Sequence, residues 1–264
     1  MSDDWRELLG AVFGIVLGCG LATAVVEVLW LRRKRELTRA RLREMAMSLS
    51  AVPPNLFFSL ASAGVWTALF TTAHALALAP LPINATTVVV ALLLVDFTYY
   101  WEHRCAHRVP VLWRLYHAVH HSSPDYTVAT AYRVSFVNQT FSPAFYLPVV
   151  MLGFHPLLVV ALQLIAFHYQ AWLHTEAIGR MGWLDRWFNT PAAHRVHHST
   201  ALAHTDRNLG AITLVWDRLF GTYAPPAEDI EYGIAGSPPP RGWLALYIDP
   251  LLRRRNRSEV RDAA

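Results

Sequence analysis

The chain has 264 residues, of which 54% are hydrophobic and 16% are charged, with a net charge of +4. Its mean hydropathy of +0.26 is high for a soluble domain and indicates a membrane protein. Two cysteines, Cys19 and Cys105, exclude a disulfide framework and a cysteine-based zinc module. Basic side chains concentrate in residues 32–43 and 253–257, a pattern that favours the cytoplasmic surface of a membrane over a nucleic acid partner.

The first apolar run covers residues 8–31 and is long enough to cross the bilayer. Only Glu27 interrupts it, and its place near the basic end suggests a side chain that reaches the membrane interface. The leader is acidic and apolar sequence continues past Ala24, which disfavours a cleaved signal peptide. Because residues 32–44 are basic, they are expected on the cytoplasmic side, with the amino terminus outside.

Four further runs have the length and composition of spans. They cover residues 56–81, 86–100, 136–154 and 157–173. Residues 243–252 are too short to cross and are expected to form an interfacial amphipathic segment. The sequence therefore predicts an all-α polytopic membrane protein with about five transmembrane helices. Its expected parts are an amino-terminal helix with its basic segment (1–47), a membrane domain with the histidines (48–224), and an interfacial segment with a basic tail (225–264).

Histidines bunch in four places. His103 and His107 follow the third span, His174 follows the last, and two similar strings, His117-Ala-Val-His120-His121 and His194-Arg-Val-His197-His198, lie in polar segments. On a helix, positions i, i+3 and i+4 share one face, so each string aims three imidazoles the same way. Counting the spans brings all four places to the cytoplasmic side. The candidate metal ligands are His103, His107, His117, His120, His121, His174, His194, His197 and His198.

Nine imidazoles form a nitrogen-rich site that suits iron, zinc, copper or nickel. They exceed what one ion can bind, so two ions are expected. A non-oxidative zinc-binding membrane protein is the alternative of a different class, although a single structural zinc uses only four ligands.

These motifs, embedded in an apolar chain, resemble the membrane fatty acid hydroxylase and sterol desaturase superfamily. The resemblance covers residues 90–223. It includes the motifs Asp96-Phe-Thr-Tyr99-Tyr100-Trp101-x-His103-Arg104 and Trp216-Asp217-Arg218-Leu-Phe220-Gly221-Thr222. The motifs are most similar to those of the alkylglycerol monooxygenase branch. It implies an oxidoreductase with two iron ions at the nine histidines, O2 as co-substrate, and hydroxylation of a C–H bond in a lipid such as a fatty acyl chain, an ether lipid or a sterol. Desaturation at the same site is the alternative, and the residues do not separate the two outcomes.

The monooxygenase reaction also implies a source of electrons. The chain has no Rossmann glycine fingerprint, no CxxCH haem motif and no cysteine set for an iron–sulfur cluster. A separate electron-transfer protein is therefore expected as a partner. The expected location is integral and multi-pass, for example in a bacterial inner membrane, with the metal site on the cytoplasmic side.

Ligating histidines usually donate their second N–H to an oxygen, so supporting residues are expected close by. Asp96 lies seven residues before His103 and shares its helical face. Gln170 occupies the position four residues before His174, where some family members carry another histidine. Asp206 and Asn208, which follow the second string, complete the supporting candidates. His168 and His204 are expected outside the ligand set, because spacing turns the first to another face and the second lies in a loop.

Overall fold

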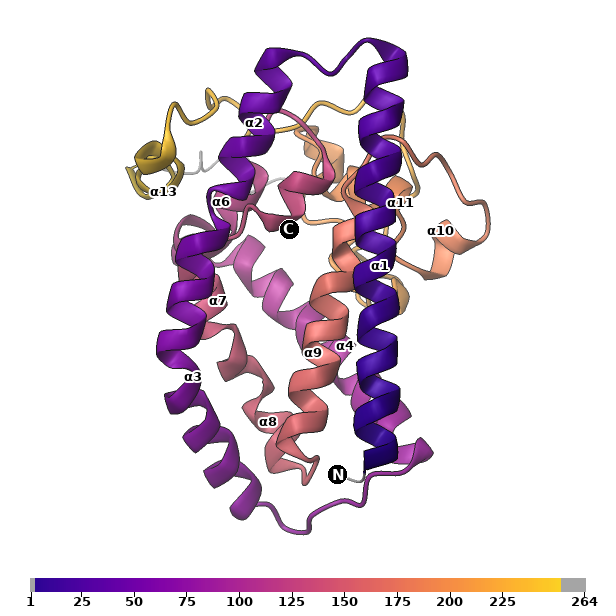
Figure 1. The fold of residues 1–264 in the computed structure, drawn as a ribbon, viewed down its shortest axis with the longest axis vertical. Coiled ribbons are helices and arrows are strands. Elements are labelled where there is room, and N and C mark those ends of the chain that lie inside the picture. The colour runs from indigo at the N-terminus through magenta and orange to yellow at the C-terminus, as the bar shows by residue number, and fades with distance from the viewer. Residues whose placement is uncertain (1–2, 253–264) are drawn as a thin grey trace.

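The computed structural model describes residues 3–252, and within them helices joined by loops make up the fold (Figure 1). Over that range no β-strand forms, and the only bridges are the isolated pairs Phe188 with Thr213 and Ser199 with Tyr232. The predicted all-α class is confirmed.

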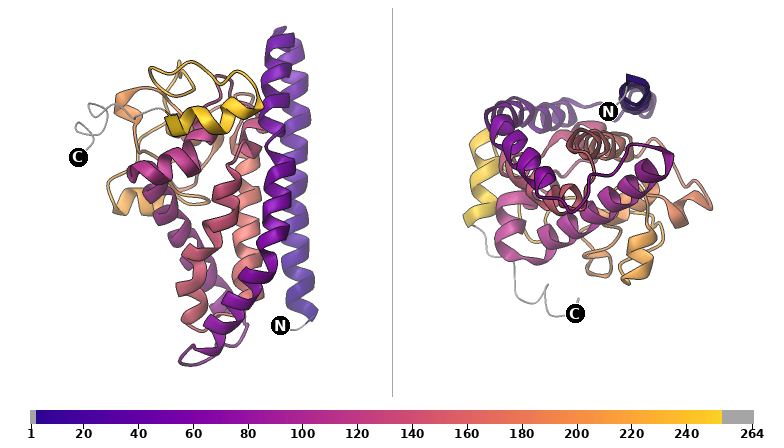
Figure 2. Two further views of the ribbon diagram at one scale, coloured as in Figure 1. Left: turned by 90° about the vertical axis from the view of Figure 1, so that its left-hand side faces the viewer. Right: turned by 90° about the horizontal axis from the view of Figure 1, so that it is seen from below.

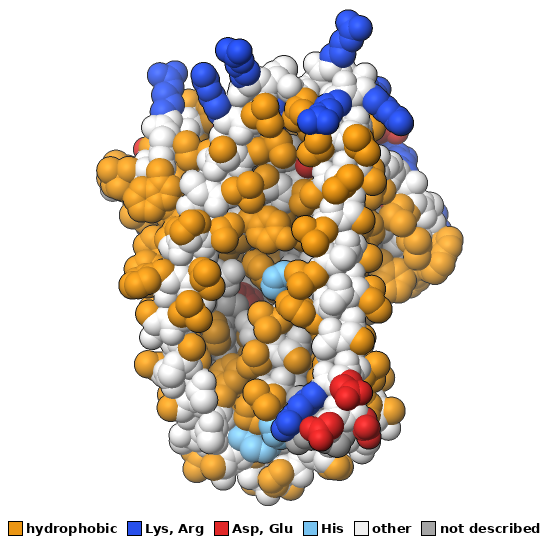
Figure 3. Space-filling view, in the orientation of Figure 1, with side chains coloured by type: hydrophobic (Ala, Val, Ile, Leu, Met, Phe, Trp, Pro, Cys, Tyr) orange, Lys and Arg blue, Asp and Glu red, His pale blue; other side chains and the backbone are white. Residues whose placement is uncertain are grey.

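Four helices of residues 3–252 are long and apolar enough to cross a membrane. They are α1 (Asp3–Lys34), α2 and α3 taken together (Arg39–Leu49 and Val52–Ala75), α4 (Ala85–Arg108), and α9 (Pro156–Tyr169) continued by η4 (Gln170–Leu173). The views in Figures 1 and 2 show α1 and α9 side by side along the long axis, α3 on the opposite side, and α4 crossing behind. Large apolar side chains cover the outward faces, as expected for contact with lipid (Figure 3).

The span expected over residues 136–154 is not one helix. It is divided into α7 (Phe136–Phe141), the 3₁₀ turn η3 (Ser142–Tyr146) and α8 (Leu147–Met151). Pro143 and Pro148 begin the last two pieces, and because proline lacks a backbone N–H it interrupts the helical hydrogen bonds. This broken segment packs against α3, α4 and α9, so protein rather than lipid surrounds much of its backbone.

A glycine turn connects the broken segment to α9. Gly153 has a φ of +102°, and a Cβ at this position would lie 2.2 Å from the Ala79 carbonyl oxygen. The Gly153 carbonyl in turn accepts a hydrogen bond of 2.9 Å from the Leu81 N–H. Only glycine fits both the backbone conformation and the close approach.

The remaining elements gather at one end of the long helices (Figure 2). They are α5 (Pro110–Leu112), the π-helical turn η1 (Trp113–His117), α6 (Ala118–His121), η2 (Val128–Tyr132), α10 (Leu184–Trp187), α11 (Pro191–His197), η5 (Leu202–His204), α12 (Val215–Leu219) and α13 (Trp243–Leu252). The bounds of α13 coincide with the expected interfacial segment.

Side-chain caps explain where several helices begin. The Thr38 hydroxyl accepts from the Arg41 N–H at the start of α2. Asn84 and Thr87 form a reciprocal capping box at the start of α4, with both bonds at 3.0 Å. Below the histidine-bearing end, α1, α4, α8 and α9 enclose a core that includes Val95, Val150 and Val159, each fully buried.

Glu27 does not reach the membrane interface as the sequence suggested. It is 2% exposed, and its carboxylate accepts hydrogen bonds from the Val128 N–H at 3.0 and 3.2 Å and from the Thr175 hydroxyl at 2.7 Å. Both partners lie in segments far away in the sequence, so only the packing of α1 against η2 and η4 reveals this role. Glu27 thus anchors α1 beside His174.

Charge is distributed unequally between the two ends of the molecule. Lys and Arg side chains gather at the end where α1 meets α2, and acidic side chains at the opposite end, near the amino terminus (Figure 3). The second basic run, residues 253–257, lies outside the described residues.

Candidate metal centre

Five elements at one end of the bundle carry the nine histidines or end beside them. His103 and His107 lie one turn apart on α4, and His117 ends η1. His120 and His121 lie on α6, while His174 directly follows η4. His194 and His197 lie on α11, and His198 caps it. All nine side chains are buried, with exposures of 1–9%.

The imidazoles form two adjacent groups. The first contains His103, His107, His117, His121 and His197, and the second contains His120, His174, His194 and His198. Within each group, one nitrogen from every ring lies within 4.8 Å of all the others. The rings of His121 and His198 stack across the boundary, with their centroids 4.3 Å apart.

The spacing of the nitrogens suits a coordination sphere. In the first group, Nε2 of His117 is 2.9 Å from Nε2 of His103 and 3.0 Å from that of His121. In the second, Nε2 of His174 is 3.2 Å from the Nε2 atoms of His120, His194 and His198. Two nitrogens bound at right angles to one ion, at about 2.1 Å each, stand roughly 3.0 Å apart. The two groups therefore fit two metal ions.

Backbone carbonyls hold several rings in the orientation that ligation requires. Nδ1 of His103 lies 2.8 Å from the Leu209 oxygen, that of His174 2.8 Å from the Gln170 oxygen, and that of His197 2.9 Å from the Arg207 oxygen. Because these Nδ1 atoms act as donors, the proton resides there and the Nε2 lone pair points inward.

Burial also keeps the imidazoles neutral. The pKa of His117, His120, His121, His194, His197 and His198 is lowered well below its usual value, first by burial and then by neighbouring histidines. Burial lowers the pKa of His174 to about 4, against the opposing effect of its bond to the Gln170 carbonyl. Neutral rings are the form that binds metal, so the donors are available at pH 7.

A π-helical turn precedes the first string, which sequence periodicity does not reveal. The turn covers Trp113–His117 and inserts extra backbone just before the ligand candidate at its end. It also places the Trp113 ring beside the histidines, with centroids 5.3 Å from His107 and 5.4 Å from His121. Tyr126 packs in the same way against the second group, 5.4 Å from His174.

Asp96 has other partners than the sequence suggested. Its buried carboxylate accepts from the Ile212 N–H at 2.9 Å, the Thr213 hydroxyl at 2.7 Å and the Trp216 indole at 3.0 Å. These bonds fix the segment after Leu209, whose carbonyl contacts His103, so Asp96 acts on that ring indirectly.

Gln170 supports the second group through its main chain. Its carbonyl accepts from His174, while its side-chain oxygen accepts from the Tyr99 hydroxyl at 2.8 Å. The side chain itself makes no hydrogen bond to a histidine among the contacts of the described residues.

Asp206 lies close to the ligand set and Asn208 shapes the turn beside it. Oδ1 of Asp206 is 3.3 Å from Nδ1 of His107, and Oδ2 is 3.3 Å from Arg108. Asn208 donates to the carbonyls of Ala193 and Ala224 at 2.9 Å each. Both residues have a positive φ, +55° for Asp206 and +52° for Asn208, a conformation that Asp and Asn tolerate better than most.

Asp217 is a supporting residue that the sequence did not single out as such. Its fully buried carboxylate accepts from the backbone N–H groups of Leu209 and Gly210 and from the Thr222 hydroxyl, at 2.7–2.8 Å. Burial raises the pKa of Asp217 to about 6. The position was visible in the sequence, but its partners depend on the folding of the loop.

His168 and His204 lie outside both groups, as expected. Nδ1 of His168 contacts the Leu164 carbonyl within its own helix, and that of His204 contacts the Ser199 hydroxyl.

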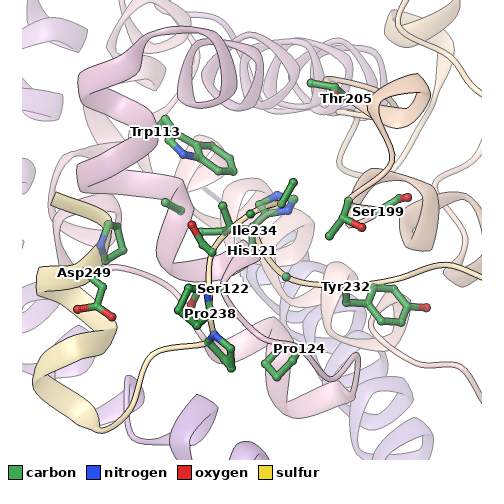
Figure 4. A pocket seen from close by; sticks show the side chains of 18 of the residues that line it. Trp113, His121, Ser122, Pro124, Ser199, Thr205, Tyr232, Ile234, Pro238 and Asp249 are labelled. Carbon is green, nitrogen blue, oxygen red and sulfur yellow. The ribbon is translucent and has the colours of Figure 1, made fainter. Parts of the chain in front are cut away.

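Two separate hollows reach the histidines. A cavity of about 830 Å³ extends between α3, α4 and α9 and touches His103, His117, His120 and His174. A second, smaller pocket of about 230 Å³ touches His107, His121 and His197. Figure 4 shows the smaller pocket, with Trp113 and Asp249 at one side and Ser199 and Tyr232 at the other. Both hollows thus reach the first group, each through different histidines.

Comparison with known proteins agrees with this geometry. The profile of the family described as "Fatty acid hydroxylase" matches residues 88–222, about half of the chain. An alkylglycerol monooxygenase of Xenopus tropicalis is 43% identical over 140 residues, or 53% of this chain and 31% of that protein. The human alkylglycerol monooxygenase is 42% identical over 145 residues, or 54% of this chain and 32% of that protein.

A bacterial relative matches over a longer stretch. The ornithine lipid hydroxylase OlsE of Rhizobium tropici is 33% identical over 179 residues, or 67% of this chain and 53% of that protein. The segments that match the alkylglycerol monooxygenases cover only about a third of the length of those proteins. No solved structure gives a significant match.

Proposed function

Because this chain belongs to the fatty acid hydroxylase family, we propose that it is a di-iron hydroxylase that inserts one oxygen atom of O2 into a C–H bond of a membrane lipid. The observation that carries the proposal is the pair of histidine groups, one of five and one of four, at the end of an apolar cavity. The names of the relatives, which are hydroxylases and monooxygenases, support hydroxylation over desaturation.

The proposed ligands are the five histidines of the first group and the four of the second. When bound there, two iron ions supply the activation of O2 that an unactivated C–H bond requires. In the overall reaction one oxygen atom enters the C–H bond and the other leaves as water, which consumes two electrons and two protons. A separate electron-transfer protein supplies the electrons, and the chain supplies orientation and exclusion of water.

The cavity performs the exclusion of water. Its wall between the histidines and the far end includes Trp66, Phe70, Leu164 and Phe167, so an alkyl chain displaces water from it. Lipid can enter from the bilayer, because long apolar helices form the sides. The reacting carbon then lies against the histidine nitrogens, away from bulk water.

The test uses the purified protein in detergent with iron, a chemical reductant, O2 and a mixed lipid extract. We expect about two irons per chain and a lipid product heavier by one oxygen atom, and the same protein with His120→Ala should give no product. An iron-loaded, folded protein that leaves all lipids unchanged would overturn the proposal. A product lighter by two hydrogens would identify a desaturase, and exclusive binding of zinc would identify the non-oxidative alternative.

We further propose that the histidine-bearing end faces the cytoplasm. The described basic side chains gather at that end, including Arg32, Arg33 and Lys34 in the last turn of α1. In a chain whose two native cysteines are replaced, Glu228→Cys should resist a membrane-impermeant thiol reagent in intact cells, while Ala85→Cys should react. The reverse labelling pattern would place the centre on the outer side.

A further inference from the structure

The cavity that holds the proposed substrate is lined by few charged side chains. None of the residues that line it in the described chain is a lysine or an arginine, and Glu102 is its only carboxylic side chain. Figure 3 shows the surface hollowed beside α3, with histidine side chains visible in the hollow. A lipid bound there finds no lysine or arginine side chain to pair with a carboxylate or phosphate group.

Glu102 lies at the histidine end of this cavity, next to His103 on α4. Its side chain is 4% exposed. Oε1 accepts a hydrogen bond of 2.9 Å from the Tyr116 hydroxyl, and the hydroxyls of Ser142 and Tyr146 also face the carboxyl group. Among the described residues, Oε2 has no hydrogen-bond partner and Glu102 forms no ion pair.

A buried acceptor without a donor is unfavourable, and such groups in folded proteins nearly always find a partner. A donor on a molecule that fills the cavity would satisfy this oxygen. A hydroxyl or an ammonium group donates to a carboxyl oxygen, whereas a carboxylate or a fully ionised phosphate has no proton to donate. The chemistry of the wall therefore selects the polar end of the lipid.

We propose that Glu102 is a positioning residue that accepts a hydrogen bond from a hydroxyl or ammonium group at the polar end of the lipid, and this proposal rests on the proposed function. The alkyl chain then extends from the histidines toward His74 and His155, which line the far end of the same cavity. Because Glu102 neighbours His103, the oxidised carbon lies close to the polar group and far from the terminal methyl. The substrate class is an amphiphile with a donor group and without an anionic end.

Binding to the metal-free protein tests the selection separately from the chemistry. The probes are hexadecylglycerol ether, the same ether with both hydroxyls methylated, hexadecylamine and hexadecanoate, each followed by thermal stabilisation in detergent. For the wild type we expect the glycerol ether and the amine to bind about 10-fold more tightly than the methylated ether and the carboxylate, as one additional hydrogen bond implies.

Substitutions at Glu102 identify the acceptor. Glu102→Met should remove the preference and leave the affinity for the methylated ether unchanged. Glu102→Gln keeps one acceptor oxygen without a charge, so it should retain preference for the hydroxyl probe and lose it for the ammonium probe. The control is Glu7→Met, the same change at an exposed side chain of α1, which should behave as the wild type. Glu102→Gln also tests the proposal if the methionine variant fails to fold.

Turnover adds a second readout. With iron and reductant, Glu102→Met should raise KM for the glycerol ether about 10-fold and shift oxidation to carbons further along the chain. Equal binding of all four probes to the wild type, or an unchanged preference in Glu102→Met, would overturn the role of Glu102. A preserved preference in a protein that oxidises no lipid would instead overturn the proposed function alone.

Discussion

Two neighbouring residues, His197 and His198, contribute to different groups of the centre. The first completes the group of five and the second the group of four. One turn of α11 and its cap therefore supply ligand candidates to both groups of histidines. No loop is needed between the two residues, because adjacent positions at the end of the helix point in different directions.

This division predicts different effects for two otherwise identical substitutions. His198→Ala leaves three imidazoles in its group and should reduce bound iron from about two to about one per chain, whereas His197→Ala leaves four and should retain about two at saturating iron. Both should lower turnover by about 100-fold or more, because each distorts the centre. Metal analysis after gel filtration measures the difference, and equal iron loss in both variants would argue against two separate groups.

At this scale, sequence patterns predicted the histidines that the structure brings together and indicated Gln170 and Asp206 beside them, but they did not reveal the partners of the buried carboxylates. The three HxxxH and HxxHH motifs are local, so helical spacing alone predicts that their rings converge. Asp96, Glu27 and Glu102 depend on partners from distant segments, and no local pattern encodes those contacts. From the sequence, Glu27 was therefore expected at the membrane interface, but the structure buries its side chain inside the protein.

Among the elements, the loop between α11 and α12 determines the shape of the centre. It carries the Arg207 and Leu209 carbonyls that orient His197 and His103. Asp217 at the start of α12 closes this loop by accepting two of its backbone N–H groups. Gly210 allows the closure, because a Cβ there would lie 1.9 Å from the Thr213 carbonyl oxygen.

Asp217→Ala should therefore destabilise the protein and weaken metal binding together. Two buried N–H groups lose their acceptor, which costs about 3 kcal/mol of unfolding free energy. Urea unfolding of the metal-free protein measures the loss, and iron titration measures the weaker binding. Glu7→Ala, at an exposed side chain of α1, provides the control and should change neither quantity. Unchanged iron affinity in a destabilised Asp217→Ala protein would show that the loop does not orient the rings.

Helical spans are easier to predict from sequence than the breaks between them. Long apolar runs correspond to α1, α3, α4 and α9, with bounds that differ by up to eight residues, because length and hydropathy determine whether a helix can cross a bilayer. The run over residues 136–154 was also expected to span, but its prolines divide it and its neighbours cover it. The π turn at Trp113–His117 likewise left no periodic signal.

For the whole molecule, burying this many histidines makes stability depend on pH. In the folded chain the pKa of buried histidines such as His117, His174 and His197 lies below the unfolded value of about 6.5. As pH falls below about 6.5, the unfolded chain binds protons that the folded chain does not, so stability is present above this pH and lost below it. Asp217 has the opposite effect, because its folded pKa of about 6 exceeds its unfolded value and its contribution therefore favours the folded chain as pH falls. It is one group against several histidines.

The metal-free protein should consequently unfold at a much lower temperature at pH 5.5 than at pH 7.5. Each histidine that protonates only in the unfolded chain contributes a loss of about 1.4 kcal/mol per pH unit. Thermal unfolding in detergent across this range measures the effect, and bound metal should delay it, since ions compete with protons for the same nitrogens. A transition temperature independent of pH would contradict the burial of neutral histidines.

The two hollows that meet at the group of five histidines have a kinetic consequence. A lipid chain that fills the large cavity touches His103 and His117 and leaves the small pocket beside His107 and His121 open. Lipid and the water-soluble reactants therefore need not exchange through one opening, and neither must depart before the other arrives. When the concentrations of the lipid and of a water-soluble reactant are both varied, the steady-state rates should follow a sequential pattern with a ternary complex rather than a ping-pong pattern.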